Sequence, residues 1–407
     1  MGFFDDLTES LTSAGKDVTQ KAKDMSEIAR LKLDIRAKED YVQKQYMAIG
    51  EAYFQKHKND EEVDEAEQFF LIREALGEIE RMKTEILKML KETPDFLSGQ
   101  QLCEGLGVSR TAVWKAIRQL EEEGYAIEAV RNRGYRLVAS PDVITAPELK
   151  TVLSTVWLGS QVNCFYETDS TNRQARKLAE EGAPHGTLVA ADSQSAGKGR
   201  RGRVWASPRG VGVWMSFILR PELSPSKASM LTLVAGMAVV AGIRQISGLS
   251  PQIKWPNDAV VDGKKICGIL TEMSTEEDSI RYVVVGIGIN VNTESFPPEI
   301  SDTATSLKLS LGHELKRAPL IGAVLKSFEQ YYSRFMEYGD MTGLMDEYNE
   351  MLANRKRQVR VLDPHGSYEG MALGIDKEGC LLVKREDDSV SAVISGEVSV
   401  RGIYGYV

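Results

Sequence analysis

The hydrophobic pattern changes character three times along the chain, so no single fold can accommodate the whole sequence. Residues 1–81 carry apolar residues at helical spacing, and residues 82–138 combine short helical stretches with two short apolar runs. Strand-like and helical runs then alternate, and only short strands with Gly and Asp turns remain after residue 355. We therefore predict a multidomain α+β protein of 407 residues, with domains at 1–81, 82–140, 141–350 and 351–407.

The composition excludes several protein classes. Hydrophobic residues make up 42% and charged residues 27%, as in soluble globular proteins, and no apolar run approaches the roughly 20 residues that span a bilayer. The N-terminus lacks the basic region of a signal peptide, and Asp6 replaces the Ser or Thr of a myristoylation motif. Four scattered cysteines and four scattered histidines form no CxxC pair or metal-like cluster. We expect a cytoplasmic protein with free thiols, no membrane contact and no metal held by the protein alone.

The first segment, residues 1–81, is predicted to be helical. Ile28, Ile35, Val42 and Ile49 recur every seven residues, and a second apolar series follows the polar break at Lys56–Glu62. This series consists of Phe69, Ile72, Leu76, Ile79 and Ile86. The pattern is typical of an antiparallel hairpin or short coiled coil that serves as a passive extension or an oligomerisation arm. Residues 1–80 resemble the helical part of small bacterial zinc-ribbon proteins without their cysteine pairs. A fusion before Met82, natural or from gene calling, is an alternative origin.

Residues 82–140 are predicted to form a winged helix-turn-helix. Ser98 and Ser109 are suited to cap two helices, Gly107 separates these helices, and two apolar runs flank the turn Arg131–Gly134. The net charge of the whole chain is −9, but this segment carries 9 basic and 8 acidic residues, whereas residues 1–81 carry 12 and 19. An acidic chain can therefore still bind DNA here. The expected DNA contacts are Ser109, Arg110, Thr111 and Lys115 on the third helix and Arg131 and Arg133 in the wing. A small helical domain with a solvated basic turn is the alternative.

The strongest candidate site is the segment Gly197–Arg203, followed by Trp205. Four cations alternate with glycines, which let the backbone fold around a ligand and present its amide groups. Arginine adds planar donors suited to phosphate and carboxylate, and the indole adds a flat face for a base or ring. This pattern indicates a nucleotide site, although a basic surface loop has the same composition.

A second candidate site follows the segment Lys254–Asp258. Asp262-Gly263 is a hairpin turn signal, and the hairpin would carry Asn257 and Asp258 at one end and Lys265 just beyond the turn. Lys254, Asp258 and Lys265 could then meet in one cleft around a metal-bound phosphate. A solvated hairpin turn is the alternative for Lys265.

Two further motifs carry weaker signals. Gly286-Ile287-Gly288-Ile289-Asn290 follows a Val-rich run, and Asn290 could hydrogen-bond a base, but the third glycine and the helix of a dinucleotide fingerprint are missing. Asp169-Ser170-Thr171-Asn172 begins a predicted helix and fits either a ligand site or a plain N-cap. Together the residues favour a nucleotide-linked transferase without naming its substrate.

In this order, these motifs resemble those of the biotin–protein ligase family over residues 82–407. The pattern comprises Gly-x-Gly-Arg-x-Gly-Arg-x-Trp, Lys-Trp-Pro-Asn-Asp, Lys-Lys-x-x-Gly-Ile-Leu and Gly-Ile-Gly-Ile-Asn. The resemblance implies a winged helix, an α/β catalytic domain similar to class II aminoacyl-tRNA synthetases, and a small SH3-like β-barrel. Lys198 departs from the arginine common at this position; it keeps the charge but loses bidentate geometry.

The resemblance also implies a role for each site residue. Biotin would contact Ser170, Thr171, Asn172, Gln194, Lys198, Gly199, Arg200 and Lys265, of which Arg200 and Lys265 are the catalytic pair. ATP would contact Arg203, Trp205, Asn257, Asp258, Asn290, Ala304, Thr305 and Ser306, with Mg²⁺ bound to ATP next to Asp258. The implied reaction forms biotinyl-5′-AMP from biotin and ATP and then transfers biotin to a lysine of a carrier protein of the acetyl-CoA carboxylase type.

The same resemblance implies a biotin-responsive repressor that binds operator DNA as an adenylate-bound homodimer. One alternative is a ligase without working repressor activity, in which the winged helix is degenerate or blocked by the acidic extension. Another is a transcription factor that senses a ligand without chemistry, which Lys265 and the arginine loop argue against. The operator sequence, the carrier protein and the role of residues 1–81 are not predictable from the residues.

Overall fold

The computed structural model describes residues 44, 47–57, 66–362, 366–394, 399–402 and 406. The chain divides into two compact units, Met1–Glu78 and Ile79–Val407. In the first unit, residues 47–57 are helical and helix α2 (Ala66–Glu92) begins, as the apolar spacing predicts. The heptad positions Ile28, Ile35 and Val42 lie outside the described residues. The hairpin therefore stays a prediction.

Helix α2 runs without a break through residue 82. Its second half supplies Ile86, Leu87 and Leu90 to a small core in which all three side chains are buried. Helices α3 (Gly99–Leu106) and α4 (Arg110–Glu122) add further buried residues to this core. Those residues are Leu102, Val113, Ala116, Ile117 and Leu120. Because one continuous helix enters this core, its C-terminal half has a structural role in the winged-helix segment.

The ends of α3 and α4 follow local rules that the sequence carries. Ser98 forms a reciprocal capping box with Gln101, and Gly107 ends α3 at φ 67°. The Ser109 hydroxyl accepts a hydrogen bond from the amide of Ala112 at the start of α4. Antiparallel strands β1 (Ala126–Val130) and β2 (Gly134–Ala139) form the wing. The predicted order of helices, turn and wing strands is therefore observed.

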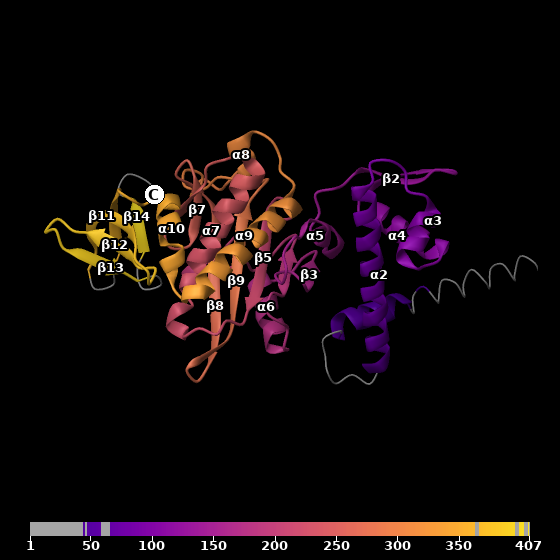
Figure 1. The fold of residues 1–407 in the computed structure, drawn as a ribbon, viewed down its shortest axis with the longest axis horizontal. Helices are drawn as coiled ribbons and strands as arrows, with labels where there is room; N and C mark the ends of the chain where they lie inside the picture. Colours follow the sequence, from indigo (N-terminus) through magenta and orange to yellow (C-terminus); the bar gives the residue numbers. More distant parts are fainter. Residues whose placement is uncertain are drawn as a thin grey trace, which may run out of the picture. The chain divides into compact units, whose positions relative to one another are not determined.

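A seven-stranded sheet with the order β3-β4-β5-β9-β8-β7-β6 organises the central part of the chain (Figure 1). Its strands are β3 (Val162–Phe165), β4 (Leu188–Ala191), β5 (Gly212–Leu219), β6 (Gln252–Lys254), β7 (Asp258–Val261), β8 (Lys264–Glu276) and β9 (Ser279–Asn290). Only β3 and β4 pair in parallel. Strand β9 includes Gly286–Asn290, so the expectation that this motif comes after its strand is wrong: its backbone continues the pairing with β5 and β8.

Helices pack on both faces of this sheet. Helices α7 (Met230–Ser247) and α9 (Arg317–Tyr338) contribute to the main apolar core, whereas α6 (Thr171–Glu180) packs through Ala175 and Ala179 against the opposite face. The segment Pro225–Ser247 is long and apolar enough to cross a membrane, but 78% of its most apolar window is buried in the protein. Burial inside the fold therefore accounts for its composition. Shorter helices are α5 (Ala146–Val152), α8 (Leu307–Leu311) and α10 (Met345–Met351).

The C-terminal part contains a five-stranded antiparallel sheet with the order β13-β12-β11-β10-β14. Its strands are β10 (Gln358–Leu362), β11 (Tyr368–Ile375), β12 (Leu381–Lys384), β13 (Val390–Val393) and β14 (Ser399–Gly402). Alternate residues such as Val359, Val361, Leu381 and Val383 are fully buried and join the main core. The sequence prediction of a small all-β segment is therefore correct in its elements.

Candidate functional site

One pocket lies over the centre of the seven-stranded sheet, on the face that carries α6. It has a volume of about 50 Å³. Ten of the predicted substrate residues line it: Ser170, Thr171, Asn172, Gln194, Lys198, Gly199, Arg200, Trp205, Asn257 and Lys265. Met215, Gly268, Ile269, Leu270, Gly286, Ile287 and Gly288, which were not predicted as substrate contacts, complete the lining. Residues from four separate motifs are thus brought together.

A polar network holds one end of the pocket. The Thr171 amide and hydroxyl both donate to Gln194 Oε1, at 2.8 and 3.1 Å. Asn172 Nδ2 donates to Glu272 Oε2 at 2.8 Å and to the Leu270 carbonyl at 3.3 Å. Because both amide orientations are fixed by protein partners, this end of the pocket presents a defined set of donors and acceptors.

The turn before α6 is held by Asp169. Its carboxylate accepts hydrogen bonds from the Ser170 amide at 2.6 Å and from Gln174 Nε2 at 2.9 Å, and Arg173 approaches to 2.5 Å. Burial alone would raise the pKa of Asp169, but these hydrogen bonds and the Arg173 charge lower it overall. Ser170 occupies the N-cap position of α6, yet its hydroxyl makes no capping bond. The plain N-cap interpretation of Ser170 is therefore disfavoured.

The glycine-rich cationic segment is a hydrogen-bonded loop. The Gly199 amide donates to the Arg203 carbonyl at 2.7 Å, and the Trp205 amide donates to the Gly197 carbonyl at 2.9 Å. Between them, Arg201 has φ 57° in the short helix η1 (Arg200–Gly202). Arg203 is exposed and lies outside the pocket lining, whereas Trp205 lies in the pocket. The loop thus divides its cations between the pocket and solvent.

Trp205 lies directly on two glycines of adjacent strands. Gly268 and Gly288 are opposite each other in the β8–β9 register. A Cβ atom added to Gly288 would lie 2.6 Å from Trp205 Nε1, and one added to Gly268 would lie 2.9 Å from Trp205 Cζ3. Only glycine therefore leaves room for the indole here, which explains why this motif contains glycines.

The charged end of the pocket is built from the β7–β8 hairpin. Asp262 and Gly263 have φ 49° and 76°, as a type I′ turn requires, and this turn places Lys265 beside Asp258. Lys265 Nζ lies 2.6 Å from Asp258 Oδ1 and 5.2 Å from the Trp205 ring centroid. The ion pair shows that the predicted meeting of Asp258 and Lys265 occurs.

Arg200 reaches the same end. Its Nη1 donates to Asn257 Oδ1 at 3.0 Å, and Asn257 Nδ2 donates to the Ile269 carbonyl at 3.1 Å. Burial lowers the pKa of Arg200, and the nearby Asp258 carboxylate opposes this change. A partly desolvated cation in the same pocket as Lys265 suits a developing negative charge.

Lys254 is connected to Asp258 through Tyr406, a residue that the sequence analysis did not single out. Its Nζ lies 3.3 Å from the centroid of the Tyr406 ring, and the Tyr406 hydroxyl donates to Asp258 Oδ2 at 2.5 Å. The aromatic residue comes from the extreme C-terminal segment, 148 positions after Asp258. No local pattern connects two residues at this separation.

Two of the remaining predicted nucleotide residues, Ala304 and Thr305, lie next to Lys265. Its amide donates to the Thr303 carbonyl at 2.8 Å, its carbonyl accepts from the Thr305 amide at 2.9 Å, and Ala304 pairs with it in a short bridge. Asn290 Nδ2 donates to the Thr305 carbonyl at 3.2 Å. The Ser306 hydroxyl caps α8 through Leu309, so its side chain is already engaged. Residues 290 and 304–306 therefore lie together near Lys265 but outside the lining of the pocket.

Sequence reasoning missed Ser216, which fixes the polar end. Its hydroxyl is fully buried and lies 2.7 Å from Asn172 Oδ1 and 2.8 Å from Thr171 Oγ1. The available signal was one hydroxyl within the otherwise buried, apolar strand β5. A buried hydroxyl requires a partner, so its neighbours were predictable as polar residues.

The described residues give little support to a cysteine nucleophile or to a metal site held by the protein. Burial raises the pKa of the Cys267 thiol, which disfavours the nucleophilic thiolate next to Lys265. In the described part of the chain, no three His, Cys, Asp or Glu side chains gather as a metal site. All four cysteines are free, as expected.

The winged helix presents a second candidate site. The six predicted DNA contacts Ser109, Arg110, Thr111, Lys115, Arg131 and Arg133 are all exposed. A cleft of about 480 Å³ lies between the start of α4 and the wing and is lined by Arg110, Arg131 and Arg133 among others. Trp114 on α4 is 53% exposed and was not predicted as a contact. Arg133 also lies 3.2 Å from Asp95, an exposed ion pair that contributes little to stability.

Comparisons with known proteins find family matches in three parts of the chain. The Biotin/lipoate A/B protein ligase family model matches residues 164–290, an HTH domain model matches 83–136, and the Biotin protein ligase C terminal domain model matches 357–401. Bifunctional ligase/repressor BirA of Bacillus subtilis is 43% identical over 308 residues, covering 75% of this chain and 94% of the relative. The protein of the same name from Escherichia coli is 30% identical with the same coverage.

A solved structure of a biotin protein ligase is also similar to this chain. The biotin protein ligase from Aquifex aeolicus in complex with biotin and ATP is 31% identical, with a TM-score of 0.53. The match covers 60% of this chain and 99% of the Aquifex chain. The three family models leave residues 1–82 unmatched.

Proposed function

This chain belongs to the family of bifunctional biotin ligase/repressors, and we propose that its central pocket forms biotinyl-5′-AMP from biotin and ATP. The chain is a biotin ligase with an HTH DNA-binding domain. The observation that carries the assignment of the site is the single pocket lined by Thr171, Gln194, Arg200 and Lys265. It combines a polar end for a neutral ring with a cationic end for an anhydride.

The polar end is the proposed biotin subsite. Ser170, Thr171, Asn172 and Gln194 would hydrogen-bond the ureido ring, since hydroxyl and amide groups supply both donors and acceptors. The Lys198 and Gly199 backbone and the Arg200 guanidinium would close over the ring and the acyl phosphate. The geometry favours placing biotin at this end of the pocket, because the side-chain amides of Asn172 and Gln194 are already oriented by Glu272 and Ser207.

The charged end is the proposed nucleotide subsite. Arg203 would hold phosphates, Trp205 would cover adenine, and Asn290, Ala304, Thr305 and Ser306 would line the base pocket. Asn257 and Asp258 would support Mg²⁺ bound to ATP. One carboxylate and one amide suit an ion that keeps phosphate and water ligands, which is how Mg²⁺ binds nucleotides.

Adenylate formation requires little covalent chemistry from the chain. The biotin carboxylate attacks the α-phosphate of ATP, and pyrophosphate leaves with the electron pair of the broken P–O bond. Lys265 and Arg200 would stabilise the charge that develops on the carboxyl and phosphate oxygens. In the second step a carrier lysine amine attacks the acyl carbon, AMP leaves, and the amine loses a proton.

Substrate entry requires the loop to move. Pockets that hold small molecules have volumes of roughly 300–1,000 Å³, and the present pocket holds about 50 Å³. Trp205 occupies the space above Gly268 and Gly288. We infer that biotin and ATP displace the indole from this glycine pair, after which the indole can cover adenine.

The winged helix is the proposed operator-binding element, and the partners are a biotin carrier protein and operator DNA. We infer a homodimer in the adenylate-bound state, because two winged helices on one DNA duplex make the second contact effectively intramolecular. We also infer a class II synthetase-like fold for the central domain, an SH3-like barrel at the C-terminus and a cytoplasmic location.

Transfer of labelled biotin to a biotin carrier domain tests the ligase proposal, with ATP omission as the control. Operator binding is tested with a duplex enriched from a random library by the protein loaded with biotin and ATP, at one fixed salt concentration. Higher affinity with biotin and ATP supports the repressor. Equal affinity in both conditions leaves a ligase without repressor activity.

A further inference from the structure

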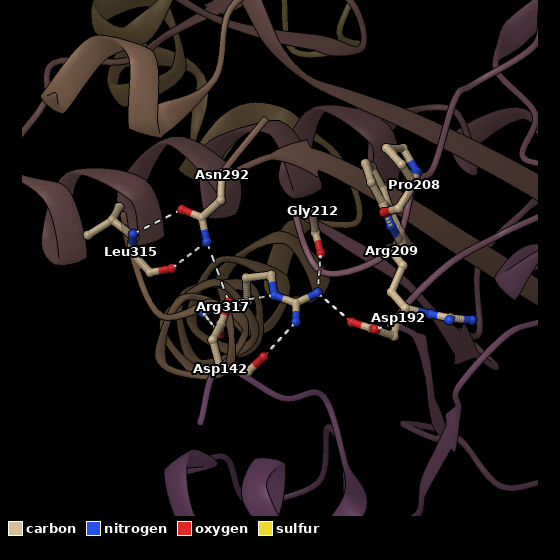
Figure 2. A network of polar contacts seen from close by, with 9 residues as sticks. Asp142, Asp192, Pro208, Arg209, Gly212, Asn292, Leu315 and Arg317 are labelled. Carbon is tan, nitrogen blue, oxygen red and sulfur yellow. Dashed lines mark hydrogen bonds and ion pairs between the residues drawn. The ribbon is translucent and has the colours of Figure 1, made fainter. Parts of the chain in front are cut away.

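Arg317, the first residue of α9, is the centre of a buried ionic network that neither substrate subsite includes. Its side chain is only 2% exposed. Arginine is seldom buried without a partner, so partners are expected around it. Every nitrogen of its guanidinium donates a hydrogen bond, as Figure 2 shows for the surrounding residues. The motifs described above gave no indication of this residue.

One side of the guanidinium holds the segment between the wing and the ligase core. Asp142 lies between β2, which ends at Ala139, and α5, which begins at Ala146. The Arg317 amide donates to Asp142 Oδ1 and Nε donates to Oδ2, both at 2.8 Å, while Nη2 donates to the Asp142 carbonyl at 2.8 Å. Lys316 Nζ donates to the Ser140 carbonyl at 3.1 Å. The start of α9 thus fixes this connecting segment at two residues.

The other side of the guanidinium holds two strand ends next to the pocket. Nη1 donates to Asp192 Oδ1 at 2.6 Å and to the Gly212 carbonyl at 3.3 Å. Asp192 comes two positions before Gln194, the partner of Thr171 in the pocket. Gly212 is paired with Asn290 in the β5–β9 register. One side chain therefore contacts the chain just after β4, two positions before Gln194, and the first residue of β5, which is paired with Asn290 on β9.

A third contact joins the connecting segment to the chain just after β9. Asn292 Oδ1 accepts from the Leu315 amide at 3.0 Å, and Asn292 Nδ2 donates to the Leu315 carbonyl at 2.9 Å and to Asp142 Oδ2 at 3.4 Å. Asn292 lies two residues beyond Asn290. Figure 2 shows Asn292, Arg317 and Asp142 side by side.

The charges make this network sensitive to small displacements. One buried cation lies between two carboxylates, and separating a buried ion pair leaves an uncompensated charge in a poorly solvated place. The paired state is therefore strongly preferred over partly separated arrangements. A shift of Asp192 together with the nearby Gln194 would have to be followed by Arg317 and then by Asp142.

We propose that Arg317 is a positioning residue that couples substrate binding at Gln194 and Asn290 to the segment of residues 140–145. The inference rests on the proposed function, because it takes biotin and ATP as the ligands of the pocket. It assigns to Asp142, Asp192 and Arg317 the contact through which an occupied pocket changes the attachment of the winged helix. The coupling is reciprocal, so a change at Asp142 also alters substrate binding.

Amide hydrogen exchange in the full-length chain tests the proposal, with and without saturating biotin and Mg-ATP. In the unmodified protein, exchange should slow both in the loop Gly197–Trp205 and in residues 139–146. Asp192→Asn removes the charge on the pocket side of Arg317. The loop should still respond to substrates in this variant, but residues 139–146 should lose their response. Asp388→Asn is the matched control, because Asp388 is an exposed ion-pair partner in the turn between β12 and β13.

Kinetics provide a second readout. Asp192→Asn should raise KM for biotin by about tenfold, as expected for a loosened charged hydrogen bond, with kcat little changed. Arg317→Lys keeps the charge but loses the planar donors, so it should abolish the response of residues 139–146 as well. Thermal unfolding of each variant verifies that it is folded at the assay temperature.

The outcomes separate the two proposals. An Asp192→Asn variant with unmodified KM and an unmodified response in residues 139–146 overturns the role of Arg317 and leaves the ligase intact. A response of the loop alone in the unmodified protein also overturns it. The absence of any response at the loop, together with no adenylate, refutes the substrate assignment of the pocket and this inference with it.

Discussion

Gly286→Ala should weaken biotin binding because the added methyl group takes the position of the Asn172 side chain. A Cβ atom at residue 286 would lie 1.9 Å from Asn172 Oδ1, 2.8 Å from its Cγ and 3.0 Å from its Nδ2. Asn172 is 7% exposed and is held by Ser216 and Glu272, so the amide cannot move aside without losing these partners.

The magnitude follows from the bonds that are lost. A neutral hydrogen bond contributes about 0.5–1.5 kcal/mol and one to a charged group about 1.5–3 kcal/mol. Asn172 forfeits one bond to a charged group and two neutral bonds, and new partners offset part of this loss. If the substitution weakens the binding free energy of biotin by about 1.4 kcal/mol, KM for biotin rises about tenfold. KM for ATP should change much less, because Asn172 lies at the opposite end of the pocket from Asp258.

The assay is pyrophosphate release as a function of biotin and then of ATP concentration, together with thermal unfolding. Gly236→Ala is the matched control: its Cβ would lie 3.7 Å from Ile253, an ordinary contact, and alanine suits the interior of α7. Ser216→Ala should raise KM for biotin in the same direction without any steric clash. A folded Gly286→Ala variant with unmodified KM for biotin would refute this reasoning.

Four further changes test the remaining residues. Lys265→Ala should reduce adenylate formation about 100-fold with a small change in melting temperature, measured by pyrophosphate release, and near-normal release would make Lys265 an ordinary hairpin lysine. Arg200→Gly should leave the fold intact but let biotinyl-AMP escape, which labelling of unrelated lysines detects; full retention would contradict its clamping role. The lowered pKa of Asp169 means that its stabilisation of the turn is present above the usual value of 3.8 and is lost as pH falls through the lower folded value. Biotin affinity should therefore weaken below about pH 4 by this route, and Asp169→Asn should remove that acid component in a fluorescence titration. Arg110→Ala should weaken DNA binding and flatten its dependence on salt by about one ion, measured by titration at several salt concentrations; an unchanged slope would remove Arg110 from the phosphate contacts.

The local features of this fold were predictable because neighbouring residues determine them. Ser98 and Ser109 cap their helices through amides three residues away, and the Asp262-Gly263 turn requires positive φ at both positions. Apolar runs marked most strands of the central sheet. The winged-helix elements were predictable for the same reason.

The candidate site was predictable only in part. The motif residues Thr171, Gln194, Arg200 and Lys265 do share one pocket. Ser216 and Tyr406 were missed, because their roles depend on Asn172 and Asp258, which are 44 and 148 positions away. Hydrophobic periodicity specifies which face of a strand is buried, but not which strand lies beside it.

The sequence by itself determined the order of the elements, their caps and turns, and the chemical types of the pocket residues. Tertiary structure alone decided that β9 lies between β5 and β8, which places Gly286 under Asn172 and Gly288 under Trp205. It also decided that Arg317 joins Asp142 to Asp192, across 175 and 125 positions. The physical reason is that capping and turn formation are local hydrogen-bond requirements, whereas strand order and buried ion pairs follow from the packing of the whole core.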